Sequence, residues 1–406
     1  MVQWNRRRRN SIYIVIPLLA CLNFVWFGVF FARLPEQQDE DADSILPPHP
    51  KSKPKPPQTS TNWRSALRDF EEGGNGMFVD RLYRQRDRLR AKAVSAAEFG
   101  IDIIDEKTTT TKHTFLKSPP DQFVEFSVPF LSPPKTGPTN STTTIILVPS
   151  HQGSFVKRQA IRETWKTETA STTILFVIAH SDCKEFDIDM GVDTTISETT
   201  RCDTIDHNFL KLEQELYHDL LEIPMVENYR RLSEKILQAY HWAMESLPNL
   251  KWFAKADDDM FVSVPKLESY LDKYDSNIPT VIGEIVVDAP VHKEGKWADP
   301  DYHRYTYPNW AKGSAGHVLS RATVDYLTQH SESLHRYQGE DTNVGIWLDE
   351  ATQAGTLKDV TFVNAPDKFI SYGYTACSTP SDAIMVGHEL KPDDQVQCHR
   401  MSQTAS

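Results

Sequence analysis

The sequence predicts an α/β protein that stands behind a single N-terminal membrane anchor. Two patterns support this prediction. Residues 12–32 are a run of 21 residues without a charge. From about residue 141 onward, apolar β-branched segments alternate with segments of helical periodicity. Strand–helix–strand order of this kind is typical of a parallel sheet that is covered by helices.

The uncharged run 12–32 predicts a transmembrane helix, because at about 1.5 Å per residue it spans a hydrocarbon core of roughly 30 Å. Four arginines at 6–9 precede it, and acidic residues within 36–43 follow it. The positive-inside rule then makes residues 1–11 a cytoplasmic tail and places the rest across the membrane, as in a type II membrane protein. The alternative is a cleaved signal peptide, whose apolar core is normally only about 7–15 residues long.

Charge and cysteine content narrow the class of protein. The formal net charge is −12, which argues against a nucleic-acid-binding protein that relies on a positive surface. Beyond the anchor lie Cys183, Cys202, Cys377 and Cys398, an even number that fits an oxidising compartment and allows two disulfides in any of three pairings. The glycosylation sequon at Asn140 is usable only in that compartment.

Residues 33–139 are expected to form a stem between the anchor and a folded domain at 140–406. Six of the eleven residues in 47–57 are proline, which favours an extended polyproline stalk. The Arg-, Ala- and Leu-rich segment 77–99 predicts a helix and is a candidate for a homodimer contact, with a solvated helix as the alternative. The Thr-, Ser- and Pro-rich segment 108–139 is expected to be a linker.

The folded domain is expected to open with a strand, a helix and a second strand. The strands are predicted at 143–149 and 173–179, and the helix at 154–165. The most regular helix is predicted over 228–247, where apolar residues recur at helical spacing. A further strand, 250–256, follows it.

Three consecutive carboxylates, those of Asp257, Asp258 and Asp259, come directly after the predicted strand 250–256. Ligands of parallel α/β sheets bind beyond the carboxyl ends of the strands. Carboxylates this close repel one another unless a cation lies between them, and oxygen ligands of this kind suit Mn²⁺ or Mg²⁺ that holds a diphosphate. A lone Asp-x-Asp is more often a solvated turn, but apolar residues flank this triplet on both sides.

Several blocks together resemble glycosyltransferase family 31, the β1,3-galactosyltransferases and β1,3-N-acetylglucosaminyltransferases. The resemblance covers roughly residues 140–392, and the order of the blocks makes it specific. In chain order the blocks are residues 158–165 (RQAIRETW), 219–221 (DLL), 229–235 (YRRLSEK), 255–262 (KADDDMFV), 307–313 with 318–320, and 340–345 (EDTNVG).

This resemblance implies a GT-A fold, a Rossmann-like nucleotide-sugar-binding sheet with helices on both faces. It also implies an inverting, metal-dependent hexosyltransferase that moves galactose or N-acetylhexosamine from a UDP-sugar to a sugar hydroxyl of a glycoconjugate in β1,3 linkage. Asp341 would be the general base that takes the proton of the acceptor, and Glu340 would orient or bind the acceptor. Asp259, with Asp257, would hold the metal ion that neutralises the departing UDP diphosphate.

The resemblance also suggests contacts with the donor. Arg158 and Arg162 are four residues apart, hence on one face of a helix, and both fit UDP contacts. For Arg162 an internal ion pair is the alternative. Lys235 would reach the uracil or a carboxylate. Asp258 and Gly313 complete the predicted donor site.

A late block, residues 386–392, resembles the family's H-x-L-x-P block. His388 is therefore the candidate for a second protein ligand of the metal, with a structural histidine as the alternative and His399 as the fallback. One departure matters for the donor: Gly316-His317 stands where a glycine–aromatic pair is usual. The sequence therefore leaves open which UDP-sugar is used, and likewise which acceptor.

Topology and resemblance together imply a Golgi membrane protein with a luminal catalytic domain. Two alternatives remain. One is a degenerate sugar-binding or chaperone-like member of the family, against which the presence of both Asp259 and Asp341 argues. The other is a membrane-anchored, metal-dependent phosphoesterase, for which a two-metal site would need further Asp or His clusters beside the triplet.

Overall fold

The computed structural model describes most of the chain beyond residue 77. The predicted tail, anchor and proline-rich stalk lie outside the described residues, as do Asn140, Cys183 and Cys377. Within the described part, none of the helices combines the length and the apolar character that crossing a bilayer requires. The described ranges are 78–99, 114–126, 129–135, 141–166, 169–180, 196–295, 297–372 and 382–404, with the side chains of 196–204 left out.

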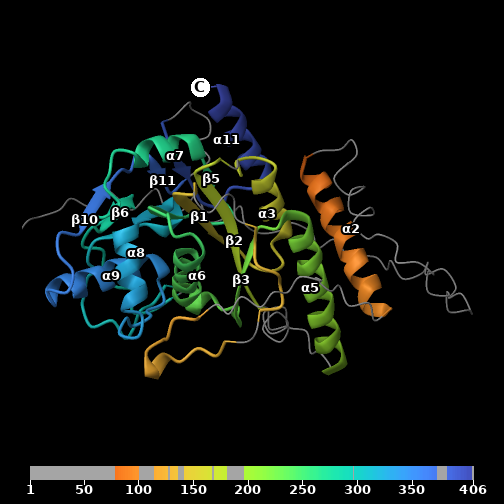
Figure 1. The fold of residues 1–406 in the computed structure, drawn as a ribbon, viewed down its shortest axis with the longest axis horizontal. Helices are drawn as coiled ribbons and strands as arrows, with labels where there is room; N and C mark the ends of the chain where they lie inside the picture. Colours follow the sequence, from red (N-terminus) through yellow and green to blue (C-terminus); the bar gives the residue numbers. More distant parts are fainter. Residues whose placement is uncertain are drawn as a thin grey trace, which may run out of the picture. The chain divides into compact units, whose positions relative to one another are not determined.

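A seven-stranded mixed sheet forms the centre of the domain (Figure 1). Its strands lie in the order β10-β6-β9-β4-β1-β2-β3. They are β1 (Thr144–Pro149), β2 (Thr172–His180), β3 (Leu220–Val226), β4 (Trp252–Lys255), β6 (Thr280–Gly283), β9 (His317–Ser320) and β10 (Thr361–Asn364). The parallel pairing that the sequence predicts for the first two strands is confirmed. The sheet is not wholly parallel, because β9 runs antiparallel to both β4 and β6.

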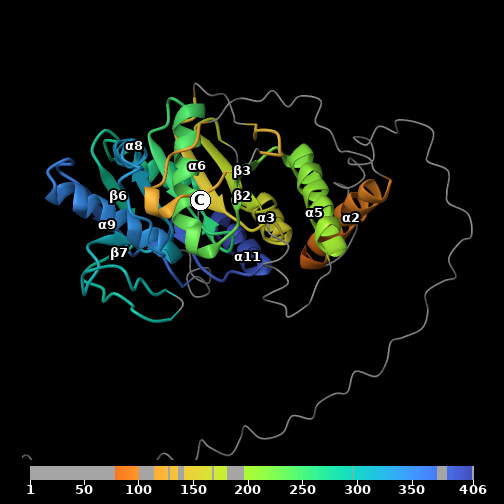
Figure 2. The same ribbon diagram turned by 90° about the horizontal axis from the view of Figure 1, so that it is seen from below.

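Helices cover both faces of this sheet (Figures 1 and 2). The predicted helices 154–165 and 228–247 correspond to α3 and α6, although α6 starts later, after a 3₁₀ turn at Tyr229–Arg231. The helices are α2 (Phe78–Glu98), α3 (Phe155–Arg162), α5 (Ile196–Tyr217), α6 (Leu232–Ser246), α7 (Val264–Leu271), α8 (Arg321–Gln329), α9 (Glu340–Gln353) and α11 (Pro392–Thr404). Two small sheets lie beside the large one. The first consists of β11 (Phe369–Ile370), β12 (Met385–Val386) and β5 (Phe261–Val262), and the second of β7 (Ile285–Val286) and β8 (Trp310–Ala311).

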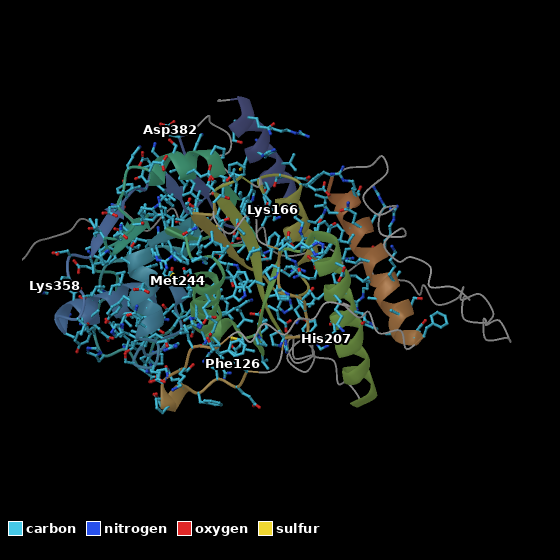
Figure 3. The ribbon with its side chains drawn as sticks, viewed as in Figure 1. Phe126, Lys166, His207, Met244, Lys358 and Asp382 are labelled. Carbon is cyan, nitrogen blue, oxygen red and sulfur yellow. The ribbon has the colours of Figure 1, made fainter. Side chains whose placement is uncertain are left out.

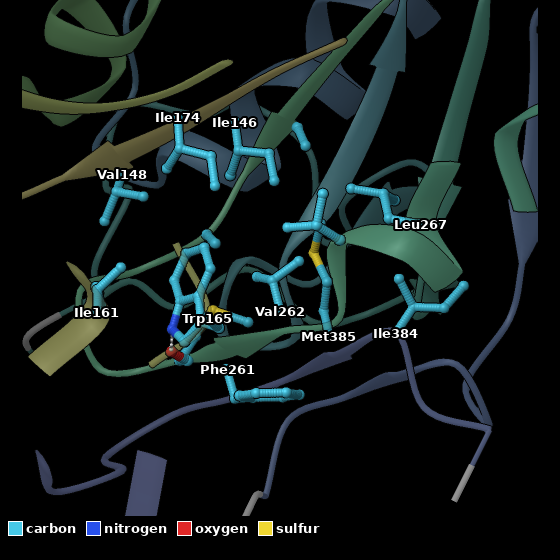
Figure 4. Packing of buried hydrophobic residues seen from close by; sticks show 14 of the residues in the cluster. Ile146, Val148, Ile161, Trp165, Ile174, Phe261, Val262, Leu267, Ile384 and Met385 are labelled. Atoms are coloured by element: carbon cyan, nitrogen blue, oxygen red, sulfur yellow. Dashed lines mark hydrogen bonds between the residues drawn. The ribbon is translucent and has the colours of Figure 1, made fainter. Parts of the chain in front are cut away.

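Every residue of β1 is buried, so apolar core lies on both faces of the sheet. Successive side chains of a strand point to opposite faces. Ile146 and Val148 accordingly pack into one cluster, and Ile145 and Leu147 into the other, which includes apolar residues of α6. Figure 4 shows part of the first cluster, with the ring of Trp165 among its aliphatic side chains.

The helix predicted at 77–99 is confirmed as α2. It packs against α5 and α3, and it lies beside α5 in both Figure 1 and Figure 2. Leu89 and Ala93 of α2 form a cluster with Phe155 of α3 and Phe209 of α5. Since α2 uses this apolar side within one chain, a homodimer contact through it stays a prediction.

A buried network of ion pairs joins α3, α5 and the start of β3. Arg158 and Glu213 have fully buried side chains, and Arg158 donates to Glu213 over 2.7 and 2.8 Å. Arg162 donates to Glu213 over 2.8 Å and to both oxygens of Asp219 over 2.7 and 2.9 Å. Burial alone would raise the pKa of Asp219, but Arg162 more than offsets it and holds that pKa below its ordinary value.

We expect Glu213→Gln to lower the free energy of unfolding by about 3–5 kcal/mol, because it leaves two buried guanidinium groups without their shared carboxylate. Urea denaturation at neutral pH measures this loss. The control is Glu294→Gln, the same substitution at an exposed position outside the network, for which we expect a change within about 0.5 kcal/mol. Similar small losses in both variants would contradict a stabilising role for the network.

Candidate functional site

The acidic triplet lies at the carboxyl end of β4, the middle strand of the sheet, as the sequence predicts. Main-chain hydrogen bonds fix the turn that carries it. Ala256 N–H donates to the carbonyl of Leu147 over 3.2 Å, and Leu390 N–H donates to the carbonyl of Asp259 over 3.1 Å. The three carboxylates are therefore held at the edge of the sheet where parallel strands end.

Each carboxylate of the triplet has a cationic neighbour. Asp258 accepts from Lys157 Nζ over 2.8 Å and from Ser150 Oγ over 2.8 Å. Asp259 Oδ2 lies 3.5 Å from the same Lys157 Nζ, and Asp257 Oδ1 lies 2.8 Å from Lys255 Nζ. Burial raises the pKa of Asp259 above its ordinary value, and the charges of Asp257 and Asp258 raise it further against the opposing effect of Lys157.

Lys255, the last residue of β4, links the triplet to the first turn of α9. Its side chain is 2% exposed, and its Nζ lies 2.8 Å from Asp257 and 3.2 Å from Glu340 Oε2. Burial disfavours the charged form of Lys255, but these two carboxylates more than offset it and raise the pKa of Lys255 above its ordinary value. The ammonium group therefore stays charged and holds two acidic segments together.

Asp341 follows Glu340 in the first turn of α9. Its Oδ2 accepts from Gly313 N–H over 2.7 Å, and its Oδ1 accepts from Thr342 N–H over 2.9 Å. A Cβ at residue 313 would lie 2.9 Å from Asp341 Oδ2, so glycine allows this approach. Burial and the charge of Glu340 raise the pKa of Asp341 to about 6, although both backbone donors oppose this.

His317 lies opposite Lys255 on the neighbouring strand β9. Its side chain is 2% exposed, and its Nε2 lies 3.9 Å from Glu340 Oε1. Neither ring nitrogen has a hydrogen-bond partner among the described residues. Burial and the charge of Lys255 lower the pKa of His317 to about 4, so the ring is neutral at neutral pH. His317, for which the sequence analysis expected an aromatic residue, therefore borders the acidic site.

The carboxylate oxygens of the triplet are ligands of the type that divalent cations prefer. The three carboxylates, with Glu340 and Asp341 nearby, outnumber the ammonium groups of Lys157 and Lys255. An ammonium group already lies between Asp258 and Asp259. Across the described part of the chain, however, no three His, Cys, Asp or Glu side chains form a group that could hold a metal. A metal site at Asp259 and Asp257 stays a prediction.

His388 is close enough to the triplet for its charge to affect Asp259. The main chain holds this segment there, since Leu390 N–H, two residues after His388, donates to the carbonyl of Asp259 over 3.1 Å. His399 lies on α11, where its Nε2 is 2.9 Å from Gln403 Nε2. A metal-binding role for His388 stays a prediction.

The three basic residues predicted to contact the donor have internal partners. Arg162 pairs with Glu213 and Asp219, which is the alternative that the sequence left open for it. Arg158 reaches the triplet only through Ser150, which accepts from Arg158 over 3.2 Å. Lys235 donates to Glu227 over 2.6 Å and to the carbonyl of Ser150 over 3.0 Å. Donor contacts of these residues stay predictions, against which their internal bonds argue.

Sequence reasoning missed Lys157 and gave Lys255 no role. The sequence contains a signal for each lysine, because Lys157 directly precedes the RQAIRETW block and Lys255 opens the KADDDMFV block. Their partners lie far along the chain, so only the fold shows what they do.

Comparison with known proteins points to one family. Residues 156–354 match the family model described as Galactosyltransferase. This stretch runs from α3 to the end of α9 and contains the triplet, Gly313 and Asp341, while β1, α2 and His388 lie outside it.

Curated relatives match over part of their length. UDP-GalNAc:beta-1,3-N-acetylgalactosaminyltransferase 2 of Xenopus tropicalis is 33% identical over 34% of this chain and 28% of the relative. The protein of the same name from Homo sapiens is 31% identical over 34% of this chain and 28% of its own length. Lactosylceramide 1,3-N-acetyl-beta-D-glucosaminyltransferase A of Danio rerio is 28% identical over 47% of this chain and 49% of the relative. The matched regions thus span from about a quarter to half of these relatives.

Solved structures resemble the chain more distantly. A glycosyltransferase involved in glycosylation of the major capsid of PBCV-1 has a TM-score of 0.30 and 13% identity, over 63% of this chain and 98% of that chain. The apo form of mouse Xyloside xylosyltransferase 1 has a TM-score of 0.26 and 9% identity, over 56% of this chain and 86% of that chain.

We expect Lys255→Met to lower the free energy of unfolding by about 3–5 kcal/mol at neutral pH, because Asp257 and Glu340 lose their common cation. The pKa of Glu340 is already raised in the folded chain, and removal of Lys255 raises it further. When the pKa of a carboxyl group is raised in the folded state, the folded state becomes more stable as the pH falls through that pKa. The deficit of Lys255→Met should therefore be smaller at about pH 5 than at about pH 8.

Urea denaturation at both pH values measures this deficit. The matched control is Lys251→Met, at an exposed position just before β4, with an expected change within about 0.5 kcal/mol. A deficit for Lys255→Met that is equal at both pH values would show that Glu340 gains no proton.

Proposed function

Because residues 156–354 belong to the galactosyltransferase family, we propose that this chain is an inverting glycosyltransferase. It transfers a hexosyl group from a UDP-sugar to a hydroxyl group of a glycoconjugate in β1,3 linkage. The names of the relatives, which are β1,3-N-acetylgalactosaminyl- and N-acetylglucosaminyltransferases, support this linkage. They favour an N-acetylhexosamine over galactose as the transferred sugar, whereas the description of the family model favours galactose.

The observation that carries the proposal is the meeting of two acidic segments at one edge of the sheet. The triplet comes from the end of β4 and the Glu340–Asp341 pair from the start of α9, and Lys255 contacts both. A nucleotide-sugar diphosphate beside the first segment would have its sugar near the second. This arrangement supports a GT-A fold for the domain.

In the proposed reaction, Asp341 accepts the proton of the acceptor hydroxyl while that oxygen attacks the anomeric carbon of the donor. The bond from that carbon to the UDP oxygen breaks, and UDP leaves with the bonding electron pair. The N–H groups of Gly313 and Thr342 hold the carboxylate of Asp341 in place. A pKa of about 6 keeps this carboxylate largely deprotonated at neutral pH and still basic enough to take a proton.

The leaving diphosphate requires positive charge beside the triplet. A divalent cation held by Asp259 and Asp257, which we propose to be Mn²⁺ or Mg²⁺, would supply it as a Lewis acid. Lys157 adds a second positive charge at the same place. Its side chain is 43% exposed, so its ammonium group is accessible to a phosphate oxygen.

We propose that the chain is a single-pass type II protein of the Golgi membrane with this domain in the lumen. The charge asymmetry around residues 12–32 supports the orientation. Cys398 is disulfide-bonded, which fits an oxidising compartment.

A donor screen on the full chain tests the activity. We expect Mn²⁺-dependent UDP release with one UDP-sugar and a β1,3-linked product on a glycan acceptor panel. Asp341→Asn should lower kcat by at least about 100-fold, because it removes the base. Asp259→Ala should abolish Mn²⁺-dependent UDP binding, which calorimetry measures directly.

The control for both variants is Asp272→Asn, at the exposed end of α7, which should keep the activity of the unaltered chain. Donor binding without turnover on every acceptor would favour a degenerate, sugar-binding protein. Phosphate release from simple esters would favour a phosphoesterase. Failure to bind UDP with Mn²⁺ would refute the nucleotide site.

The pH profile provides a further test. Since the base must be deprotonated, kcat/KM should fall about tenfold per pH unit below about pH 6. Glu340→Gln removes the negative charge that raises the pKa of Asp341, so the acid inflection should move to lower pH. Ordinary carboxyl groups titrate at about pH 4. An inflection at that pH in the unaltered chain would argue against Asp341 as the base.

A further inference from the structure

A segment outside the family match reaches the catalytic end of α9. Residues 114–126, here called the strap, precede the matched stretch by some thirty residues. The strap crosses α6 and continues to the turn 331–339 that leads into α9. In Figure 3 its residue Phe126 lies below α6, and Phe126 packs against the same core cluster as Met244 of that helix.

Hydrogen bonds anchor the strap to α6. Leu116 N–H donates to Gln238 Oε1 and the amide group of Gln238 donates back to the carbonyl of Leu116, both over 2.9 Å. Ser118 Oγ donates to Glu234 Oε2 over 3.0 Å. Val124 is buried in the same core cluster as α6. The strap therefore has a fixed position on the domain.

From this position Gln122 holds the peptide of Arg336. Arg336 N–H donates to Gln122 Oε1 over 2.7 Å, and Gln122 Nε2 donates to the carbonyl of Arg336 over 3.1 Å. Gln122 Nε2 also lies 3.1 Å from His335 Nε2. Both halves of one side-chain amide thus bind one residue of the turn, as a neighbouring strand would.

The turn is bonded in the same way to the first turn of α9. Tyr337 N–H donates to Asn343 Oδ1 over 2.9 Å, and Asn343 Nδ2 donates to the carbonyl of Tyr337 over 2.7 Å. Asn343 Nδ2 also lies 2.7 Å from Ser233 Oγ at the start of α6. Asn343 is fully buried and stands two residues after Asp341.

A second contact supports the same turn. Arg336 Nε donates over 2.9 Å to Glu234 Oε2, the oxygen that also accepts from Ser118 of the strap. Both side chains of this ion pair are buried, at 7% and 1% exposure. The strap, the start of α6 and the turn before α9 therefore form one connected hydrogen-bond network.

We propose that Gln122 is a positioning residue for the base Asp341, acting through the main chain of Arg336 and the Tyr337–Asn343 pair. The inference rests on the proposed function, because it takes Asp341 as the base. It assigns to a segment upstream of the family domain the task of fixing the carboxylate against the acceptor hydroxyl. Small displacements of such a group cost rate rather than donor affinity.

Gln122→Ala in the full chain tests this role. We expect kcat to fall by about tenfold or more while KM for the donor changes by less than about twofold. Hydrogen exchange measured on a peptide covering 333–339 should become faster, while peptides of β1 keep their protection. Gln122→Glu keeps the acceptor for Arg336 N–H and loses the donor, so its kcat should lie between those of Gln122→Ala and the unaltered chain.

The matched control is Lys117→Ala. It removes an exposed 2.9 Å ion pair between Lys117 and Glu332, which joins the same strap to the same turn. We expect it to change neither kcat nor exchange. If Gln122→Ala fails to fold, Gln122→Glu carries the test with the same measurements.

The outcomes separate this inference from the proposed function. An active chain in which Gln122→Ala behaves like Lys117→Ala overturns the positioning role and leaves the transferase proposal intact. A chain that turns over no UDP-sugar overturns the transferase proposal, and the role of Gln122 at a base falls with it. A matched rise in KM with unchanged kcat would also overturn the inference, because it would place Gln122 in donor binding.

Discussion

The buried ammonium group of Lys255 is the interaction on which the rest of the site depends. It stands at the end of the middle strand and contacts a carboxylate from each of two segments that are far apart in the sequence. Without this cation, the charges of Asp257 and Glu340 would repel each other, and the buried carboxylate of Glu340 would take up a proton more readily. The position of α9 relative to β4, and hence of Asp341 relative to the triplet, is therefore tied to one charged side chain.

Local sequence pattern predicted the elements around the triplet, but not the helix α9 that carries Asp341. The strands β1, β2 and β4 and the helices α3 and α6 were recognisable because their apolar residues follow strand or helix periodicity. The place of the triplet after β4 followed from the same pattern. The antiparallel strand β9, which lies between β4 and β6, did not, because strand order depends on pairing between distant segments.

The basic residues of the site show the limit of such reasoning most clearly. Helical spacing places Arg158 and Arg162 on one face, but spacing does not reveal what that face meets. The fold puts Glu213 and Asp219 there, and the two guanidinium groups become part of the core. Lys157 and Lys255 meet the acidic site instead. Which cation binds a ligand and which one neutralises an internal acid is decided by tertiary contacts.

The position of β1 has a practical consequence for work on this protein. The family match begins at residue 156, after β1 has ended, yet β1 pairs with β4 and β2 near the middle of the sheet. A recombinant fragment cut at the family boundary would lack an inner strand and leave two strands with unpaired edges. Such edges recruit other chains, so expression of the matched region alone would produce aggregates, and chimeras with relatives need their junction well upstream of it.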